Sequence, residues 1–165
     1  MEPSNQPLVE VTGSLRGIRT SAVKQAVRQA LRRHGSDEWR VCVELCCDER
    51  MRDLNLRFRG VDESTDVLSF QAPRLPGNAD LRCGDIAISV EFASRQAKER
   101  GVSLEHEVVA LAIHGALHLA GLDDDSPANR ENMIRAMNEV AVECGFDIDK
   151  EWASVGHAGE QGAAR

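Results

Sequence analysis

The amino-acid sequence predicts an α+β fold in which about five helices cover a small mixed sheet of four strands. Three observations support this prediction. The chain has 165 residues, which is enough for one hydrophobic core. Hydrophobic residues make up 42% of it and charged residues 28%, which is typical of a globular protein. Segments with apolar residues at every second position occur between segments in which they recur every three or four residues, as expected when strands and helices mix along a chain.

The first half of the chain is predicted to contain two strands and two helices. Residues 8–11 and 41–45 have the apolar pattern of short strands. Small apolar residues recur at helical spacing over residues 20–35, where a threonine or a serine can act as the N-cap and a glycine ends the helix. Asp48 is the expected cap of a second helix, which Gly60 ends.

The second half is predicted to contain two more strands and three helices. A stretch with two prolines and a glycine separates the strands and predicts a loop. The last helix opens with Ser126 and Pro127, a favourable pair because the first turn of a helix does not need the N–H that proline lacks. The predicted ranges are 66–70 and 84–90 for the strands, 71–80 for the loop, and 91–100, 103–120 and 126–145 for the helices.

The domain organisation and the compartment follow from simple features. We expect residues 1–150 to form a single domain and residues 151–165 to form a disordered tail. The five cysteines are odd in number and form no Cys-x-x-Cys pair, so we expect reduced cysteines in the core. The longest apolar run, residues 108–113, is far shorter than the ~20 residues that cross a bilayer. A cytoplasmic protein without membrane contact is therefore expected.

Charge is distributed unevenly. The formal net charge of −7 argues against a protein that coats nucleic acid by bulk attraction. Residues 11–36 nevertheless contain no acidic residue, and Lys24, Arg28 and Arg32 share one side of the predicted helix there. This row can be a solvated helix face or an extension of an RNA-binding surface, and the sequence leaves both readings open.

The clearest chemical signal is the segment His114-Gly-Ala-Leu-His118-Leu-Ala-Gly-Leu-Asp-Asp-Asp. Two histidines four positions apart on a helix lie about 40° apart around its axis and roughly 6 Å apart along it, so both imidazoles can reach one ion. Gly121 is expected to end the helix, and a reversal there brings residues 123–125 back towards the histidines. One carboxylate can then be the third ligand, with water at the fourth position, as in catalytic metal sites.

Two other interpretations fit this segment less well. A pair of hydrogen-bonded core histidines has the same spacing, but the glycine and the acidic run favour a metal site. Zinc peptidases that use this histidine spacing carry a glutamate directly after the first histidine as the general base. Gly115 occupies that position here, which argues against a peptidase.

Three stretches, in the same order along the chain, resemble the YbeY endoribonucleases, metal-dependent bacterial enzymes of ribosomal RNA maturation and ribosome quality control. Residues 55–60 and 65–70 (NLRFRG and TDVLSF) are similar to the family's arginine-bearing helix and its T-D-V-L-S-F strand. Residues 84–89 (GDIAIS) are similar to its G-D-I strand, and residues 114–124 to its H-G-x-L-H-L-x-G-Y-D-H motif.

The resemblance implies metal ligands at His114, His118 and Asp124 and a catalytic arginine at Arg59. The implied cofactor is one divalent metal ion, with Zn²⁺ as the first candidate. Arg59 is then a permanently charged fork directed at phosphate. Without the resemblance, an arginine that caps the carbonyl groups at the end of its own helix is the simpler interpretation.

Two positions depart from the family's pattern. Asp124 replaces the usual third histidine, and Leu122 replaces the usual tyrosine. Aspartate can bind zinc, but its negative charge makes the bound water less acidic and favours harder ions such as manganese. Asp123 or Asp125 can also take the place of Asp124 as the third ligand.

The expected function is that of a metal-dependent, single-strand-specific endoribonuclease, a hydrolase of phosphodiester bonds, in the maturation of 16S and other ribosomal RNA and in ribosome quality control. The expected partners are single-stranded ribosomal RNA and the ribosome or its subunits, with neither DNA nor a membrane. Two alternatives stay open at this point. One is a metallopeptidase-like hydrolase, and the other is a non-catalytic ribosome assembly factor with a structural metal.

Overall fold

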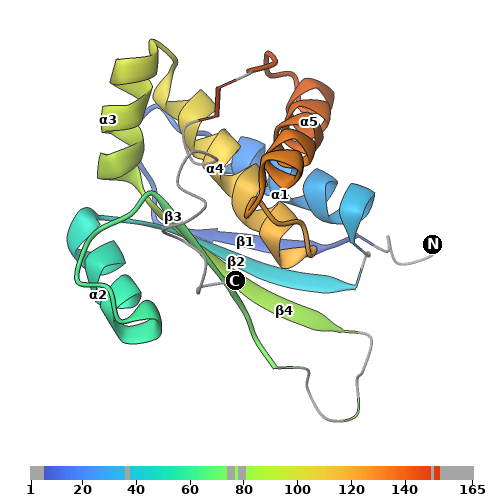
Figure 1. The fold of residues 1–165 in the computed structure, drawn as a ribbon, viewed down its shortest axis with the longest axis horizontal. Helices are drawn as coiled ribbons and strands as arrows, with labels where there is room; N and C mark the ends of the chain where they lie inside the picture. The colour runs from blue at the N-terminus through green and yellow to red at the C-terminus, as the bar shows by residue number, and fades with distance from the viewer. Residues whose placement is uncertain (1–5, 36–37, 74–76, 78–80, 150, 153–165) are drawn as a thin grey trace.

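The computed structural model describes residues 6–35, 38–73, 77, 81–149 and 151–152. Within these residues it contains four strands and five helices, which confirms the predicted α+β class (Figure 1). Their bounds are β1 Leu8–Thr12, α1 Thr20–His34, β2 Trp39–Cys46, α2 Asp48–Arg59, β3 Val67–Gln71, β4 Arg82–Ser89, α3 Val90–Arg100, α4 Leu104–Leu119 and α5 Pro127–Glu143.

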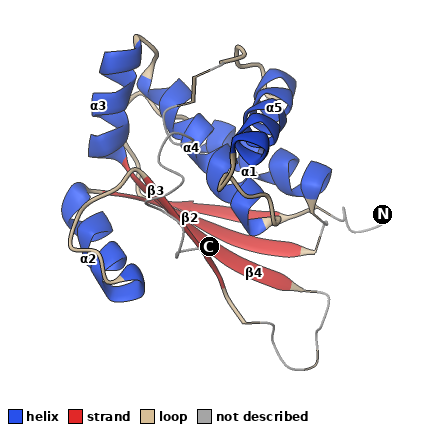
Figure 2. Ribbon diagram, viewed as in Figure 1, coloured by secondary structure: helices blue, strands red, loops and turns tan. Residues whose placement is uncertain are grey.

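The strands form one mixed sheet in the order β1-β2-β4-β3 (Figure 2). The pairs β1–β2 and β2–β4 are parallel, because a helix joins β1 to β2 and the segment with α2 and β3 lies between β2 and β4. Strand β3 pairs with β4 in the antiparallel sense and is an edge of the sheet. The predicted mixed sheet of four strands is therefore confirmed.

The two faces of the sheet are covered differently. Val67 and Ile86 belong to the main hydrophobic core with residues of α1, α4 and α5. Their neighbours Leu68 and Ala87 point to the opposite face, where they pack against Met51 of α2. Figure 1 shows α2 on one side of the sheet and α1, α4 and α5 on the other. The alternation of side chains along each strand thus produces a large core on one face and a small cluster on the other.

Helix α4 is the central helix. It packs against α1, α3, α5, β3 and β4, and residues 107–117 are all buried. A helix that is apolar around its whole circumference is stable only in the interior of a protein. Polar side chains on such a helix are therefore surrounded by protein and must find partners there.

The helix caps agree with the sequence prediction at Ser126 and differ from it at α1 and α2. The side chains of Ser103 and Ser126 accept the hydrogen bonds that cap α4 and α5. Helix α1 has Arg19 at its N-cap position instead of a threonine or serine, and Arg19 makes no side-chain cap bond but an ion pair with Glu105 of α4. Asp48 is not a cap but lies inside the first turn of α2, because other segments use its carboxylate.

The remaining sequence predictions concern the cysteines, the tail and the membrane. All five cysteines are free, but they are half-buried or exposed, so their predicted place in the core is wrong. Three of them lie on the central strands β2 and β4, and the other two are at the N-cap of α2 and the C-cap of α5, namely Cys42, Cys46, Cys83, Cys47 and Cys144. In the tail, Trp152 is buried, whereas residues 153–165 lie outside the described residues. No helix among the residues described above is long and apolar enough to cross a membrane.

Candidate metal centre

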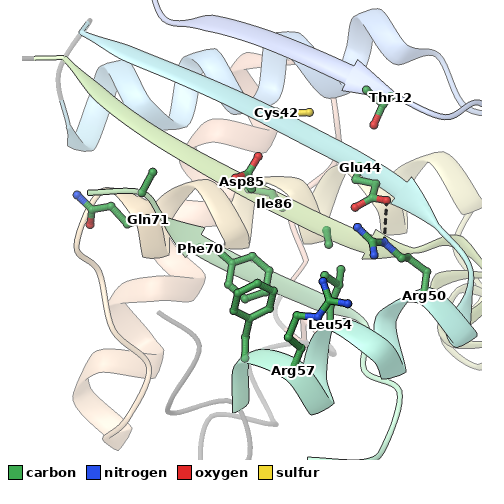
Figure 3. A pocket seen from close by; sticks show the side chains of 13 residues that line it. Thr12, Cys42, Glu44, Arg50, Leu54, Arg57, Phe70, Gln71, Asp85 and Ile86 are labelled. Carbon is green, nitrogen blue, oxygen red and sulfur yellow. Dashed lines mark hydrogen bonds and ion pairs between the residues drawn. The ribbon is translucent and has the colours of Figure 1, made fainter. Parts of the chain in front are cut away.

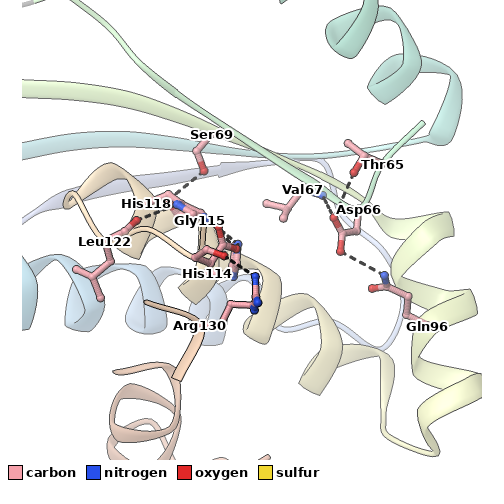
Figure 4. A network of polar contacts seen from close by, with 11 residues as sticks. Thr65, Asp66, Val67, Ser69, Gln96, His114, Gly115, His118, Leu122 and Arg130 are labelled. Atoms are coloured by element: carbon pink, nitrogen blue, oxygen red, sulfur yellow. Dashed lines mark hydrogen bonds and ion pairs between the residues drawn. The ribbon is translucent and has the colours of Figure 1, made fainter. Parts of the chain in front are cut away.

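Three side chains meet at the C-terminal end of α4. The Nε2 atoms of His114 and His118 lie 2.8 Å apart (Figure 4). The Oδ2 atom of Asp124 lies 3.5 Å from the first and 3.6 Å from the second. Ligand atoms at about 2.1 Å from a tetrahedral zinc ion are roughly 3.4 Å from one another. The group therefore has the size and the donor atoms that one divalent ion requires.

The turn after α4 explains how Asp124 reaches the histidines. Gly121 has a φ of +102°, a conformation that favours glycine. The N–H of Gly121 donates to the carbonyl of His118, and the N–H of Leu122 donates to that of Leu117. These two bonds are those of a Schellman motif, which ends a helix and reverses the chain. The predicted reversal at Gly121 is thus confirmed.

The same turn orients one of the imidazoles. Nδ1 of His118 lies 2.9 Å from the carbonyl oxygen of Leu122. A carbonyl only accepts, so Nδ1 carries the proton and donates it. In a neutral imidazole the lone pair is then on Nε2, the atom that faces His114 and Asp124. A backbone bond of this kind is typical of histidines that bind metal ions.

The side chains of the group are almost entirely buried. His114 and Asp124 are fully buried, whereas His118 is partly exposed. A buried carboxylate is costly unless it is paired or coordinates a metal. The side chain of His118 is 6% exposed, the largest fraction of the three, so the group is nearest the solvent at this residue.

The structure distinguishes the three aspartates of the acidic run. Asp124 points inward and belongs to the group that can hold a metal ion. Asp123 and Asp125 are exposed. The carboxylate of Asp125 accepts a hydrogen bond of 2.6 Å from Asn129. Of the alternatives that the sequence left open, the geometry favours Asp124.

The close packing at Gly115 explains why no glutamate follows His114. A Cβ atom at Gly115 would lie 2.8 Å from Cγ2 of Ile86 and 3.0 Å from Oγ of Ser69. Ser69 also donates a hydrogen bond to the carbonyl of Gly115 (Figure 4). This position therefore faces the sheet rather than the metal centre, and a general base of the peptidase kind does not fit there.

Arg59 is not part of the group of three. It is the last residue of α2, which lies on the opposite face of the sheet from α4. Met51, Asn55 and Arg59 follow one another every four residues, and the first two are buried, so this side of α2 faces the protein. Nη1 of Arg59 donates to the side-chain oxygen of Asn55 at 3.4 Å. The simpler interpretation of the sequence was that Arg59 caps the backbone carbonyls at the end of its own helix. The hydrogen bond to Asn55 goes to a side chain instead.

The basic row of α1 is separate from the metal centre as well. Helix α1 packs its apolar side against β1 and α4. Arg28 of that row donates a hydrogen bond to the carbonyl of Pro7, near the start of β1.

A cleft of about 580 Å³ opens on the face of the sheet that α2 covers (Figure 3). The rings of Phe58 and Phe70 form part of its wall, with their centroids 4.9 Å apart. Arg57 and Asp85 also line it, and none of the three candidate metal ligands does. The cleft and the metal centre are thus on different faces of the sheet.

The sequence prediction missed one residue beside the metal centre. Arg130, in the first turn of α5, is half-buried, and its Nη1 lies 3.5 Å from the backbone carbonyl oxygen of Asp124. The positive end of the helix dipole is in the first turn and disfavours a cation there. That unusual position was the available signal, although it does not by itself reveal the contact with Asp124.

Comparisons with known proteins show which family this chain is similar to. The family model described as Endoribonuclease YbeY matches residues 11–145. A protein named Endoribonuclease YbeY from Chelativorans sp. (strain BNC1) is 42% identical over 128 residues, which cover 76% of this chain and 77% of the relative. A protein of the same name from Desulfitobacterium hafniense (strain Y51) is 40% identical over 141 residues, which cover 81% and 88%.

A solved structure supports the same relationship. The solution structure of a protein from Thermotoga maritima superimposes with a TM-score of 0.55 and is 26% identical in sequence. The match covers 82% of this chain and 91% of the Thermotoga protein. With a family model that spans most of the chain and relatives of this similarity, the chain belongs to the YbeY endoribonuclease family.

Proposed function

We propose that the protein is a metal-dependent endoribonuclease that cleaves single-stranded RNA. In this proposal residues 1–150 form one hydrolase domain that acts in the cytoplasm, on 16S and other ribosomal RNA, in ribosome maturation and quality control. The observation that carries it is the buried group of His114, His118 and Asp124, which lies within residues 11–145, the range that the family model matches. The relatives' printed name, Endoribonuclease YbeY, supports the reaction class.

The proposed cofactor is one divalent metal ion held by these three side chains. Two imidazole nitrogens and one carboxylate oxygen form a ligand set typical of catalytic zinc, so Zn²⁺ is the first candidate. The carboxylate also suits Mn²⁺, which makes metal identity the first quantity to measure. When bound, the ion supplies an activated water molecule and neutralises charge on the phosphate.

The residues of the chain have distinct roles in this proposal. Leu122 holds the His118 ring through its carbonyl, so that Nε2 is available as a ligand. Arg59 binds a phosphate of the RNA, which must then pass the edge strand β3 to reach both Arg59 and the metal centre. The phosphodiester P–O bond breaks by addition of water.

A cleavage assay on a single-stranded RNA oligonucleotide tests the proposal. The wild-type protein should cut the RNA with its metal bound, should stop cutting it after chelation, and should regain activity when the metal is returned. The His114→Ala variant is the negative control. Cleavage of casein instead of RNA would indicate a metallopeptidase-like hydrolase, against which the packing at Gly115 argues.

The third possibility, a non-catalytic ribosome assembly factor, has its own signature. Such a protein would bind ribosomal subunits and retain its metal, but its cleavage of RNA would not exceed that of His114→Ala. This result would overturn the proposed nuclease activity.

A further inference from the structure

An arginine of α5, Arg130, lies beside the turn that carries Asp124. Nη1 of Arg130 donates to the backbone carbonyl of Asp124, the same residue whose carboxylate faces the two histidines. Figure 4 draws the Arg130 side chain together with those of His114 and His118. Because the carbonyl and the carboxylate belong to one residue, the guanidinium lies at the rim of the group that can hold the ion.

The local structure does not account for a cation at this position. Within the described part of the chain, no carboxylate forms an ion pair with Arg130, and its one hydrogen bond is that to Asp124. Arg100, which is also half-buried, pairs with the carboxylate of Glu107. A cation in the first turn of α5 opposes the helix dipole, so it does not stabilise the helix either.

The chemistry of the guanidinium group indicates what it can bind. A guanidinium has five N–H donors, of which the carbonyl of Asp124 uses one. The remaining donors form a planar fork that matches two oxygens of a phosphate. A phosphodiester brought to the metal centre would lie within reach of this fork.

The charge balance supports the same assignment. Compared with a centre of three neutral ligands, the carboxylate of Asp124 lowers the net charge of the centre by one unit. Arg130 adds one positive charge directly beside Asp124. The attraction of the centre for an anionic substrate is thereby restored, although the third ligand is an acid.

We propose that Arg130 is a substrate-binding residue that holds a non-bridging phosphate oxygen of single-stranded RNA at the metal centre. The proposal rests on the proposed nuclease function. It assigns Arg130 a role in binding, distinct from that of the metal ligands and of Arg59.

The test uses the metal-loaded full chain and a short, fluorescent, single-stranded 2′-O-methyl RNA, whose integrity is checked on a gel. The main variant is Arg130→Gln, because a glutamine can still donate to the carbonyl of Asp124 but carries no charge. Arg130→Lys keeps the charge without the fork. Arg135→Gln is the matched control, since Arg135 is on the same helix, is exposed and bonds only to Asn132 in the described structure.

The expected results are specific. Arg130→Gln should weaken binding about tenfold, as the loss of a charged hydrogen bond predicts. The slope of log affinity against log salt should fall by about 0.7 for the lost phosphate contact. Its metal content and thermal midpoint should equal those of wild type. Arg130→Lys should bind with intermediate affinity, and Arg135→Gln like wild type. In the cleavage assay, Arg130→Gln should show a higher KM.

Three results would overturn the proposal. The first is unchanged binding by Arg130→Gln or no binding by wild type. The second is loss of metal from Arg130→Gln, which would make Arg130 a support for the Asp124 turn. The third is equal weakening by Arg135→Gln, which would indicate bulk charge. If wild type fails to cleave RNA above His114→Ala, the proposed function fails; if wild type cleaves and Arg130→Gln binds normally, only the role of Arg130 fails.

Discussion

The two ends of α4 carry two buried polar clusters, each of which combines histidine with acidic side chains. The clusters differ in the group that lies next to the buried carboxylate. At the N-terminal end, the carboxylate of Glu107, which is 1% exposed, accepts a hydrogen bond of 2.7 Å from Arg100. Arg100 also pairs with Asp149. At the C-terminal end, the carboxylate of Asp124 faces the Nε2 atoms of His114 and His118. In the first cluster the guanidinium of Arg100 neutralises the buried carboxylate. In the second cluster the imidazole nitrogens next to the carboxylate can offer lone pairs to an ion.

The histidine of the first cluster shows what this difference means. The ring of His106 stacks on Trp152, with centroids 5.3 Å apart, and its Nε2 lies 3.6 Å from Asp149. His106 is therefore not an exposed surface histidine, because the chain after α5 returns and covers it. Histidine and acid next to each other are thus not enough for a metal site. The donor atoms must converge without a protein cation between them.

The largest expected effect comes from removing the acid of the second cluster. Asp124→Ala leaves two ligands, so the bound metal should fall from about one ion per chain towards zero, and RNA cleavage should fall by more than about 100-fold. Elemental analysis measures the metal, and circular dichroism should show an unchanged fold. Asp124→His restores a third nitrogen ligand and should retain the ion. Full retention of metal by Asp124→Ala would exclude Asp124 as a ligand.

The next effect separates catalysis from metal binding. Arg59→Ala should keep the ion, since Arg59 is outside the group of three, but should lower kcat/KM by roughly 100-fold, as the loss of a group that stabilises phosphate charge predicts. The matched control is Arg57→Ala, an exposed arginine of the same helix that lines the cleft. Cleavage by Arg59→Ala at the wild-type rate would remove Arg59 from the mechanism.

A change in the first cluster should affect stability and leave the metal in place. Arg100→Ala leaves the buried carboxylate of Glu107 without its guanidinium partner and should cost about 3 kcal/mol of unfolding free energy. Burial already raises the pKa of Glu107, and the nearby Arg100 opposes that rise. Urea denaturation measures the loss, and metal content is the second readout. If Arg100→Ala lost its metal instead, the two clusters would be coupled rather than independent.

The sequence predicted the second cluster well because that cluster is local. Two histidines on one helix, the glycine that ends it and the acid after it lie within residues 114–124. Helical spacing and turn geometry determine their relative positions. The order of strands and helices was predictable for the same reason, since each element follows from a short pattern.

The residues that the sequence prediction missed have partners far along the chain. Asp48 was expected to cap its own helix, yet its carboxylate accepts hydrogen bonds from Ser64, Ser89 and Arg95. Trp152 was assigned to the tail, yet it packs against His106, on α4. Arg130 belongs to α5 and contacts the turn before it. Such contacts depend on how the elements pack, which local periodicity does not encode.

The smallest expected effect is the response of the first cluster to pH. Burial lowers the pKa of His106, with a further contribution from Arg100. The unfolded chain, with a histidine pKa of about 6.5, then binds a proton more readily than the folded chain. This contribution to stability is present at pH values above about 6.5 and is lost as pH falls towards the lower pKa of the folded state. Glu107 acts in the opposite direction, because a raised carboxyl pKa favours the folded state at low pH.

The variant His106→Gln isolates the histidine, because it removes the titrating ring and leaves Glu107 and Arg100 in place. Thermal midpoints of wild type and variant, measured between about pH 7.5 and pH 5, should show a smaller decrease on acidification for the variant. His34→Gln is the control for histidine burial elsewhere, since burial also lowers the pKa of His34 but its helix, α1, lies outside this cluster. Parallel curves for wild type and His106→Gln would show that the first cluster does not respond to pH through its histidine.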